Sequence, residues 1–517
     1  MRTPINRRSF MGSAAVTGAF TIVPRHVLGG AAFVPPSDKV TLAHIGMGTQ
    51  GFSELGGLLS NPRIQIVAIC DPNENGNDYV EWSKNSVRNR LRGYLGKPNW
   101  RENDTGVPGG REVGREVVET YYANQRAAEK FTAVKTYADS RELFDKEKDV
   151  DMVKVMTPDH HHAPACIAAM KLGKHTLVHK PLSNRMYEQR LVIETARKTG
   201  VGTHLLAYGS GAGNAQICER IKQGVIGKLR EIHNWTNRPV WPQYTELPKD
   251  KPAVPKGFDW DLWLGPAMYR PYHPHYTHTV FRGWYEFGGG TMADMGIYSL
   301  WPVLTTLGLD SPISAEAWPT TTCWIVDGVS RTADNDFAYP LSSKARFEFA
   351  ARGDMPAVEL YWYDGGMAPE LPADIKAANI RTGSDGMILF IGDEGKIYAE
   401  FRGASPRLFN SRGNQPLFPE AAGARGGGGQ GARQRGGAGG GESERLPVWQ
   451  SAVEGGAQSP GSFLNAGPIS DTVCLWAVAL RARKKVLFDS ANMKITNMDA
   501  ANKFLVREYR PGWGLSA

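Results

Sequence analysis

Short apolar runs and amphipathic stretches alternate through the N-terminal part of the chain. The apolar runs have the length of buried strands and occupy residues 40–45, 64–69, 150–156, 175–178 and 201–206. Helical spacing of apolar residues predicts helices at 163–172 and 184–198. Strands that alternate with helices indicate a parallel sheet with right-handed crossovers. The polar stretch 73–130 interrupts this order, and we expect it to be a surface excursion with one or two helices.

The pattern changes after residue 208. Residues 229–236 alternate apolar and polar side chains, which is typical of a half-exposed antiparallel strand. Further strands of the same second sheet are expected at 345–350, at 357–363 and within 387–401. Helices are expected at 214–223 and 470–482. The chain is long enough to bury a large core in two domains.

The first apolar run ends in a glycine-rich turn, and a helical pattern and a second run follow it. Glycines at this spacing permit a tight turn, a close approach to a pyrophosphate, and packing of the helix on the strand. The helix N-terminus favours the phosphate charge. Asp71 lies 20 residues after Gly51, where its carboxylate can bind ribose hydroxyls and repel a 2′-phosphate, so NAD is favoured over NADP. The cofactor contacts predicted for this unit are Gly46, Met47, Gly48, Thr49, Gln50, Gly51 and Asp71.

Two more loops follow the carboxyl ends of predicted strands, where the ligand crevice of such a sheet lies. Lys180 is the first candidate for chemistry, because burial and neighbours can tune its charge there. The alternative is an ordinary surface lysine. The adjacent histidines 160–162 cannot all converge on one ion, so we predict no metal site. The cofactor contacts expected from these loops are Thr157, Pro158, His162, His179 and Lys180.

A glycine run at 288–290 opens a predicted helix that reaches about Leu307. Asp294 and Tyr298 are four residues apart and therefore share one face of it. This pair can bracket a sugar hydroxyl, and Tyr298 can take the proton as hydride leaves if Lys180 lowers its ordinary pKa of about 10. We therefore predict Lys180, Asp294 and Tyr298 as catalytic residues. The alternative is a helix whose aspartate favours the dipole and whose tyrosine is buried.

Loops rich in aromatic and hydrogen-bonding side chains precede that helix. Aromatic faces stack on sugar C–H surfaces while polar groups bind hydroxyls, although a packed proline–aromatic loop would look the same. The substrate-binding residues predicted here are Arg238, Trp241, His275, Tyr276 and Arg282.

The N-terminal sequence NRRSFM, followed by the mildly apolar stretch 12–23, is typical of a twin-arginine export signal. The stretch is too short to span a bilayer, so we expect a periplasmic or otherwise exported protein without a membrane anchor in its mature form. A disordered basic tail is the alternative. Residues 1–30 hold four arginines and no acid, so the formal charge of +8 falls to +4 without them. No dense basic face with interleaved aromatics emerges, and nucleic-acid binding is not expected.

Two features carry no predicted chemistry. The five cysteines are far apart and odd in number, so we expect buried small apolar residues rather than disulfides or metal ligands. Residues 421–441 are nearly all Gly, Ala, Arg and Gln, and we expect a disordered loop within the second domain.

Together these motifs resemble the Gfo/Idh/MocA family, which includes glucose-fructose oxidoreductase and inositol 2-dehydrogenase. The similarity covers nearly the whole mature chain and rests on the segments GMGTQG, TPDHHHA, HKP, TNRPVWPQ, DLWLGP, GGGTMADMG and REYRPGW. It implies an α/β fold with a Rossmann NAD-binding domain at 38–207 and an α+β substrate domain with an open, predominantly antiparallel sheet at 208–462. It also implies a C-terminal helix and tail at 463–517 on the domain junction, after a signal and linker at 1–34. Sugar would bind between the domains, and the second sheet would form a homo-oligomer.

Two motifs depart from the family pattern. The family's EKP motif is HKP here, so the lysine role carries to Lys180 while the preceding glutamate is lost. The resemblance also implies a cis-proline at Pro181. The family's Asp-x-x-x-His pair is Asp294 and Tyr298 here, similar to the glucose-fructose oxidoreductase branch. That difference fits proton transfer through a phenol.

The resulting hypothesis is an exported oxidoreductase that transfers hydride between a sugar CH–OH group and tightly bound NAD, with NADP less favoured. One alternative is an NAD-dependent glycosidase or lyase that oxidises a sugar carbon transiently, eliminates the substituent and reduces again. A keto-sugar or lactone product distinguishes the first from the second, which yields a free sugar without net redox change. The other alternative is a non-catalytic sugar- or nucleotide-binding protein.

Overall fold

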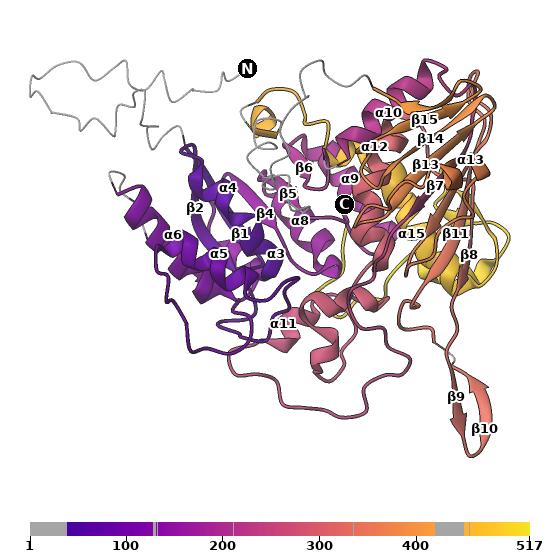
Figure 1. Cartoon of the computed structure of the whole chain (residues 1–517). Helices are drawn as coiled ribbons and strands as arrows, with labels where there is room; N and C mark the ends of the chain where they lie inside the picture. The colour runs from indigo at the N-terminus through magenta and orange to yellow at the C-terminus, as the bar shows by residue number, and fades with distance from the viewer. Residues whose placement is uncertain are drawn as a thin grey trace, which may run out of the picture.

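The computed structural model describes residues 39–127, 131, 133–209, 211–333, 335–418, 449–453 and 455–516. The expected signal and linker at 1–34 and the expected disordered loop at 421–441 lie outside these residues. Figure 1 shows two sheet-based parts, the N-terminal one in indigo to magenta and the other mostly in orange. Helices lie between them.

The N-terminal part is built on a six-stranded parallel sheet with the strand order β3-β2-β1-β4-β5-β6. The strands are β1 (Val40–Ile45), β2 (Ile64–Cys70), β3 (Lys135–Tyr137), β4 (Met152–Val155), β5 (His175–Val178) and β6 (Thr203–Leu205). The five predicted apolar runs are therefore strands, and β3 is an additional edge strand. Since β1 and β4 are neighbours at the centre, their carboxyl ends define the crevice of the sheet.

Helices cover both faces of this sheet (Figure 1). They are α3 (Thr49–Ser53), α4 (Leu55–Ser60), α5 (Ser86–Leu95), α6 (Arg111–Gln125), α7 (Ser140–Lys146), α8 (His162–Lys171) and α9 (Met186–Thr199). The single helix expected after the glycine turn is broken at Glu54 into α3 and α4. The polar stretch 73–130 contains the expected helices, but α5 and α6 are not superficial. Their apolar faces join the core beside β2, because amphipathic spacing supplied a buried stripe despite the polar composition.

The second part is built on a ten-stranded sheet with the order β16-β15-β14-β13-β7-β12-β11-β8-β17-β18. The strands are β7 (Leu229–Trp235), β8 (Ser314–Pro319), β11 (Ser343–Phe349), β12 (Val358–Tyr363), β13 (Met387–Gly392), β14 (Gly395–Glu400), β15 (Arg407–Asn410), β16 (Gly413–Pro416), β17 (Val486–Asp489) and β18 (Lys494–Ile495). Only the β7–β12 pair is parallel. Along β11, buried and half-buried side chains alternate, as expected for a sheet with one covered face. A separate hairpin of β9 (Cys323–Val326) and β10 (Val329–Thr332) projects from the body (Figure 1).

The helices between the two sheets are α10 (Ala212–Lys222), α12 (Ile297–Leu307) and α15 (Gly467–Ala482). α15 packs against α9 of the first part and β8 of the second. Two short helices, α11 (Trp260–Leu264) and α13 (Ala373–Ala377), lie outside this layer. A continuous apolar core joins residues of both sheets through α12 and α15, so the two parts are held in one arrangement.

Two further expectations concern cysteines and membranes. All five cysteines are free, and four are buried, but Cys323 is exposed because it lies on the projecting hairpin. The expectation that all are buried is wrong for that residue. Within the described ranges, no helix combines the length and apolar character needed to cross a bilayer.

Candidate active site

The glycine turn lies at the carboxyl end of β1 and begins α3. Gly46 has φ +95°, and a Cβ there would stand 2.6 Å from the carbonyl oxygen of Met156. A Cβ on Gly51 would stand 2.6 Å from the Gly46 oxygen. Only glycine fits both positions, so the backbone forms the tight cradle that a dinucleotide pyrophosphate requires.

Asp71 follows β2 and borders the same cleft. Its Oδ2 accepts the Met47 N–H at 2.7 Å, and its Oδ1 accepts the Asn73 N–H at 2.8 Å. Burial raises the pKa of this carboxyl group, while the two N–H groups oppose the increase. Each oxygen keeps a lone pair, so the group is placed to accept ribose hydroxyls as predicted.

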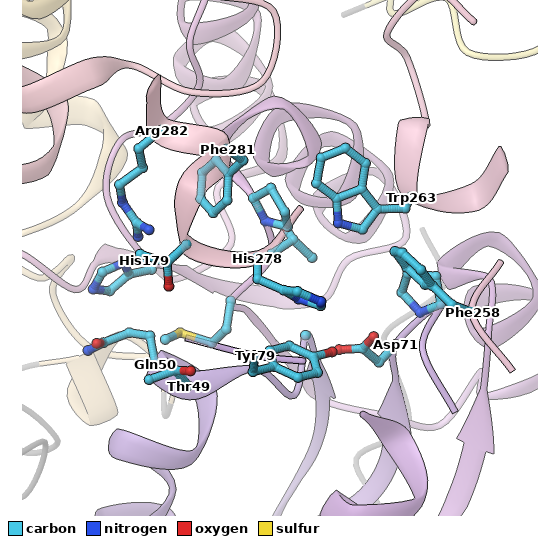
Figure 2. A pocket seen from close by; sticks show the side chains of 17 residues that line it. Thr49, Gln50, Asp71, Tyr79, His179, Phe258, Trp263, His278, Phe281 and Arg282 are labelled. Carbon is cyan, nitrogen blue, oxygen red and sulfur yellow. The ribbon is translucent and has the colours of Figure 1, made fainter. Parts of the chain in front are cut away.

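The cleft beside the turn occupies about 720 Å³, part of it open solvent. Figure 2 shows its two ends, with Asp71 at one and His179 and Arg282 at the other. Nine of the predicted site residues line it: Gly46, Gly48, Thr49, Gln50, Asp71, Thr157, Pro158, His179 and Arg282. These residues and the glycine cradle fit a dinucleotide with its nicotinamide toward His179.

An aromatic wall that we did not predict closes the cleft from outside. Its residues are Tyr79, Phe258, Trp263, His278 and Phe281. The rings of Tyr79 and His278 are 3.9 Å apart, and His278 Nε2 lies 3.1 Å from Asp78 Oδ2. The segment holding Tyr79 leaves the carboxyl end of β2, and this position was the available signal for its role.

The three predicted catalytic side chains do not line the cleft themselves but meet next to His179 and Arg282, which line its inner end. Lys180 follows β5, and the peptide bond to Pro181 is cis, as the resemblance implied. Lys180 Nζ lies 2.5 Å from Asp294 Oδ1 and 5.2 Å from the centre of the Tyr298 ring. Asp294 is on a π-helical turn, Met292–Gly296, and Tyr298 is in the first turn of α12. The expected regular helix therefore starts with a wider turn, and both side chains still reach Lys180.

Strong electrostatic coupling holds this cluster together. Burial lowers the pKa of Lys180, and Arg282 lowers it further, while Asp294 opposes the decrease. Burial alone would raise the pKa of Asp294, but Lys180, Arg282 and Arg238 bring it well below its usual range. Asp294 is therefore a carboxylate, and the lysine beside it is poised to change its protonation more easily than an exposed lysine.

His179 links Tyr298 to groups beneath the glycine turn. Its Nε2 lies 3.3 Å from the Tyr298 hydroxyl and 3.4 Å from Glu54 Oε1. Burial, together with Lys180 and Arg282, moves the His179 pKa well below its usual value, so the ring is neutral and can accept the phenol hydrogen bond. Glu54 in turn accepts from Gln50 Nε2 at 2.8 Å and lies 3.4 Å from Lys154 Nζ. We did not predict Glu54; its i, i+4 spacing from Gln50 was the only signal.

Several predicted residues do not line the cleft. His162 contacts the carbonyl oxygens of Thr157 and Pro181 and supports the two loops from below. His160 and His161 also contact backbone carbonyls, and the described residues hold no metal-binding cluster. Trp241 is buried against Gly283.

His275 and Tyr276 also lie away from the cleft. His275 stacks on Tyr244, and Tyr276 packs edge-on against Trp284. Their proline–aromatic loop therefore packs together, as in the alternative interpretation. The remaining predicted substrate residue, Arg238, lies over the ring of Trp82, and neither of them lines the cleft.

Two family models match parts of this chain. The Gfo/Idh/MocA model described as "Oxidoreductase family, NAD-binding Rossmann fold" matches residues 93–205. The model described as "Oxidoreductase family, C-terminal alpha/beta domain" matches residues 223–321. Two segments of the chain thus match the NAD-binding and C-terminal domain models of this oxidoreductase family, and the predicted α/β fold with its second, mostly antiparallel sheet is confirmed.

A glycosyl hydrolase family 109 protein of Shewanella baltica is 24% identical over 242 residues, which is 44% of this chain and 44% of the relative. The chain therefore spans less than half the length of this relative. An NAD-binding oxidoreductase from Klebsiella pneumoniae is 16% identical, with a TM-score of 0.49 over 87% of this chain and 99% of that one. A levoglucosan dehydrogenase in complex with NADH and L-sorbose is 16% identical, with the same TM-score and the same coverages.

Proposed function

We propose that this chain, two segments of which match domain models of the Gfo/Idh/MocA oxidoreductases, is an NAD-dependent enzyme that oxidises a CH–OH group of a sugar or sugar derivative. The observation that carries the proposal is the Lys180–Asp294–Tyr298 cluster, which contacts His179 and Arg282 at the inner end of the cleft. NAD is proposed over NADP because the Asp71 carboxylate would repel a 2′-phosphate. The glycine turn and Asp71 would hold the adenosine and pyrophosphate.

In the proposed mechanism, Lys180 and Asp294 orient the substrate hydroxyl. Tyr298 in its phenolate form takes the proton of this hydroxyl, and the phenol that results donates a hydrogen bond to His179 Nε2, which keeps it oriented. NAD, when bound, supplies the hydride acceptor. Phe281, which lies beside Arg282 at this end of the cleft, limits the access of water there.

The first experiment is to denature the purified protein and identify the released nucleotide by absorbance and mass. Stoichiometric NAD(H) supports a cofactor that is recycled within the enzyme. The protein is then offered sugars while nicotinamide reduction is followed. Tyr298→Phe should lose about 10²–10⁴-fold in rate without losing the nucleotide. Tyr361→Phe is the matched control, because Tyr361 is on β12 and bonds Glu359. A protein that binds no nucleotide would contradict the proposal.

A second candidate is a glycosidase that works by transient oxidation, elimination and re-reduction. It is favoured by the similarity to glycosyl hydrolase family 109 proteins, which covers 44% of this chain. The same Tyr298 and Lys180 would serve both reactions. A glycoside that yields free sugar with no net nicotinamide reduction would favour this candidate, and a stable keto-sugar or lactone would favour the first.

We also propose that the chain is exported by the twin-arginine route. The support is the NRRSFM sequence followed by an apolar stretch. Replacing both Arg7 and Arg8 with lysine should retain the protein in the cytoplasm, which fractionation would detect. Equal export of this variant would refute the proposal.

A further inference from the structure

The catalytic cluster has more cationic than anionic side chains. Lys180, Arg282 and Arg238 all depress the pKa of Asp294, so three cations act on one carboxylate. Lys180 and Arg282 approach the same oxygen, Oδ1, at 2.5 and 3.4 Å. Two charges of like sign at one oxygen are unfavourable unless more negative charge is nearby.

The neighbouring carboxylates reduce this excess without removing it. Asp159 also faces Lys180 and Arg282, and its Oδ2 accepts the Gly289 N–H at 2.9 Å. A further arginine, Arg402, lies 4.7 Å from the centre of the Tyr298 ring. Its nearest carboxylate is Asp385, at 3.7 Å.

Four cations therefore face three carboxylates around the reacting position, which leaves about one uncompensated positive charge.

The two guanidinium groups of Arg238 and Arg282 have donors to spare. The Arg282 guanidinium forms an ion pair with Asp294 through Nε and lies over the Phe281 ring with Cζ 4.6 Å from its centre, and the side chain is 12% exposed. The Arg238 guanidinium stacks over Trp82, with Cζ 5.4 Å from the ring centre, and it donates no hydrogen bond to a described residue, although the Arg238 backbone N–H donates to Thr236 Oγ1. A guanidinium carries five N–H donors in a planar fork that matches a carboxylate. Figure 2 places Arg282 beside His179, at the end of the cleft opposite Asp71.

We propose that the substrate is a sugar acid whose carboxylate is bound by Arg238 and Arg282 while Lys180, Asp294 and Tyr298 hold the CH–OH group. A carboxylate supplies one negative charge, equal to the excess, whereas a phosphate monoester would supply more. Trp82, 46% exposed beside Arg238, offers a flat face for the sugar ring. This inference rests on the proposed function for the chemical step, but binding of the sugar acid can be tested separately from its oxidation.

The test compares matched probes with the nucleotide-loaded full-length enzyme. Gluconate is compared with glucose, galacturonate with galactose, and glucose 6-phosphate serves as a third charge class. Binding is measured by calorimetry, and turnover by nicotinamide reduction. We expect the acids to bind about 10- to 100-fold more tightly than their neutral partners. In Arg238→Gln the ratio of affinities for acid and neutral sugar should fall toward one. The control, Arg230→Gln, changes an exposed ion pair with Asp393 and should leave that ratio unchanged.

Each outcome decides the inference. Equal or tighter binding of neutral sugars, or a preference for the phosphate, would overturn it. An acid preference that survives Arg238→Gln and also Arg282→Gln would overturn the assignment to these residues. Arginine-dependent binding of acids without turnover would support the inference while contradicting the proposed oxidoreductase function.

Discussion

The ion pair of Lys180 and Asp294 predicts that replacing the aspartate destabilises the fold more than replacing the lysine. Their charged atoms are 2.5 Å apart, and the side chains are 2% and 11% exposed. At an effective dielectric constant of about 20, two unit charges at this separation attract by about 7 kcal/mol. The Arg282 contact at 3.4 Å is worth about 5 kcal/mol on the same basis. Desolvation of each ion offsets much of this attraction.

Asp294→Asn should be the more damaging of the two single substitutions. It leaves Lys180 and Arg282 close together with no carboxylate between them, and we expect a loss of about 3–5 kcal/mol in the free energy of unfolding. Lys180→Met leaves Asp294 with Arg282 as its partner, so the loss should be about 1–3 kcal/mol. The double variant should lose about 2–3 kcal/mol less than the sum of the two single losses.

The assay is urea unfolding of the four proteins at about pH 7 and about pH 9. In Asp294→Asn the folded Lys180 has lost the carboxylate that raises its pKa, so its pKa lies further below the unfolded value of about 10.4. The unfolded state then binds more protons between the two values, and stability rises with pH. Asp294→Asn should therefore recover stability at the higher pH, relative to the double variant. Additive losses together with no recovery at about pH 9 would refute the reasoning.

Three more predictions follow from local geometry. Gly46→Ala forces φ +95° on alanine, so it should lower the free energy of unfolding by about 1–3 kcal/mol and weaken NAD binding in a titration. The control is Gly93→Ala in α5, where the added Cβ has open space, and it should raise the free energy of unfolding by about 0.5–1 kcal/mol. Arg507→Leu leaves the fully buried Glu188 without its ion-pair partner and should cost about 3–5 kcal/mol in chemical unfolding. Burial raises the pKa of Asp364 to about 6, above the unfolded value of about 3.9, so its protonated form stabilises the fold. Relative to Asp364→Asn, the wild type should lose about 2 kcal/mol between about pH 4 and about pH 6, which unfolding at both pH values would measure.

Much of the fold could be predicted because its signals are local. The predicted apolar run 40–45 is β1, and the run 64–69 is β2 apart from one residue. Strand length, helical spacing and glycine placement depend on a few neighbouring residues, so each leaves a readable pattern. The packing of α5 and α6 on the sheet was missed because polar composition masked an amphipathic stripe.

Only part of the candidate active site could be predicted from the sequence. Asp294 and Tyr298 are close in sequence, so their shared face could be predicted, although the π-helical turn could not. The spacing of Glu54 from Gln50 could not reveal its contact with His179, because that contact joins residues 125 positions apart. His275 and Tyr276 had the composition of a sugar-binding loop, and tertiary packing turned them into an aromatic cluster.

The sequence by itself therefore determined the succession of strands and helices in a nucleotide-binding unit, the glycine turn, and the candidate lysine, aspartate and tyrosine. These depend on backbone conformation and short-range periodicity. Only the tertiary structure decided that Lys180 and Arg282 share one oxygen of Asp294, 114 positions from the lysine, and that Tyr79 and His278 close the cleft. Such contacts depend on how distant segments pack, and the balance of charge at the site follows from that packing.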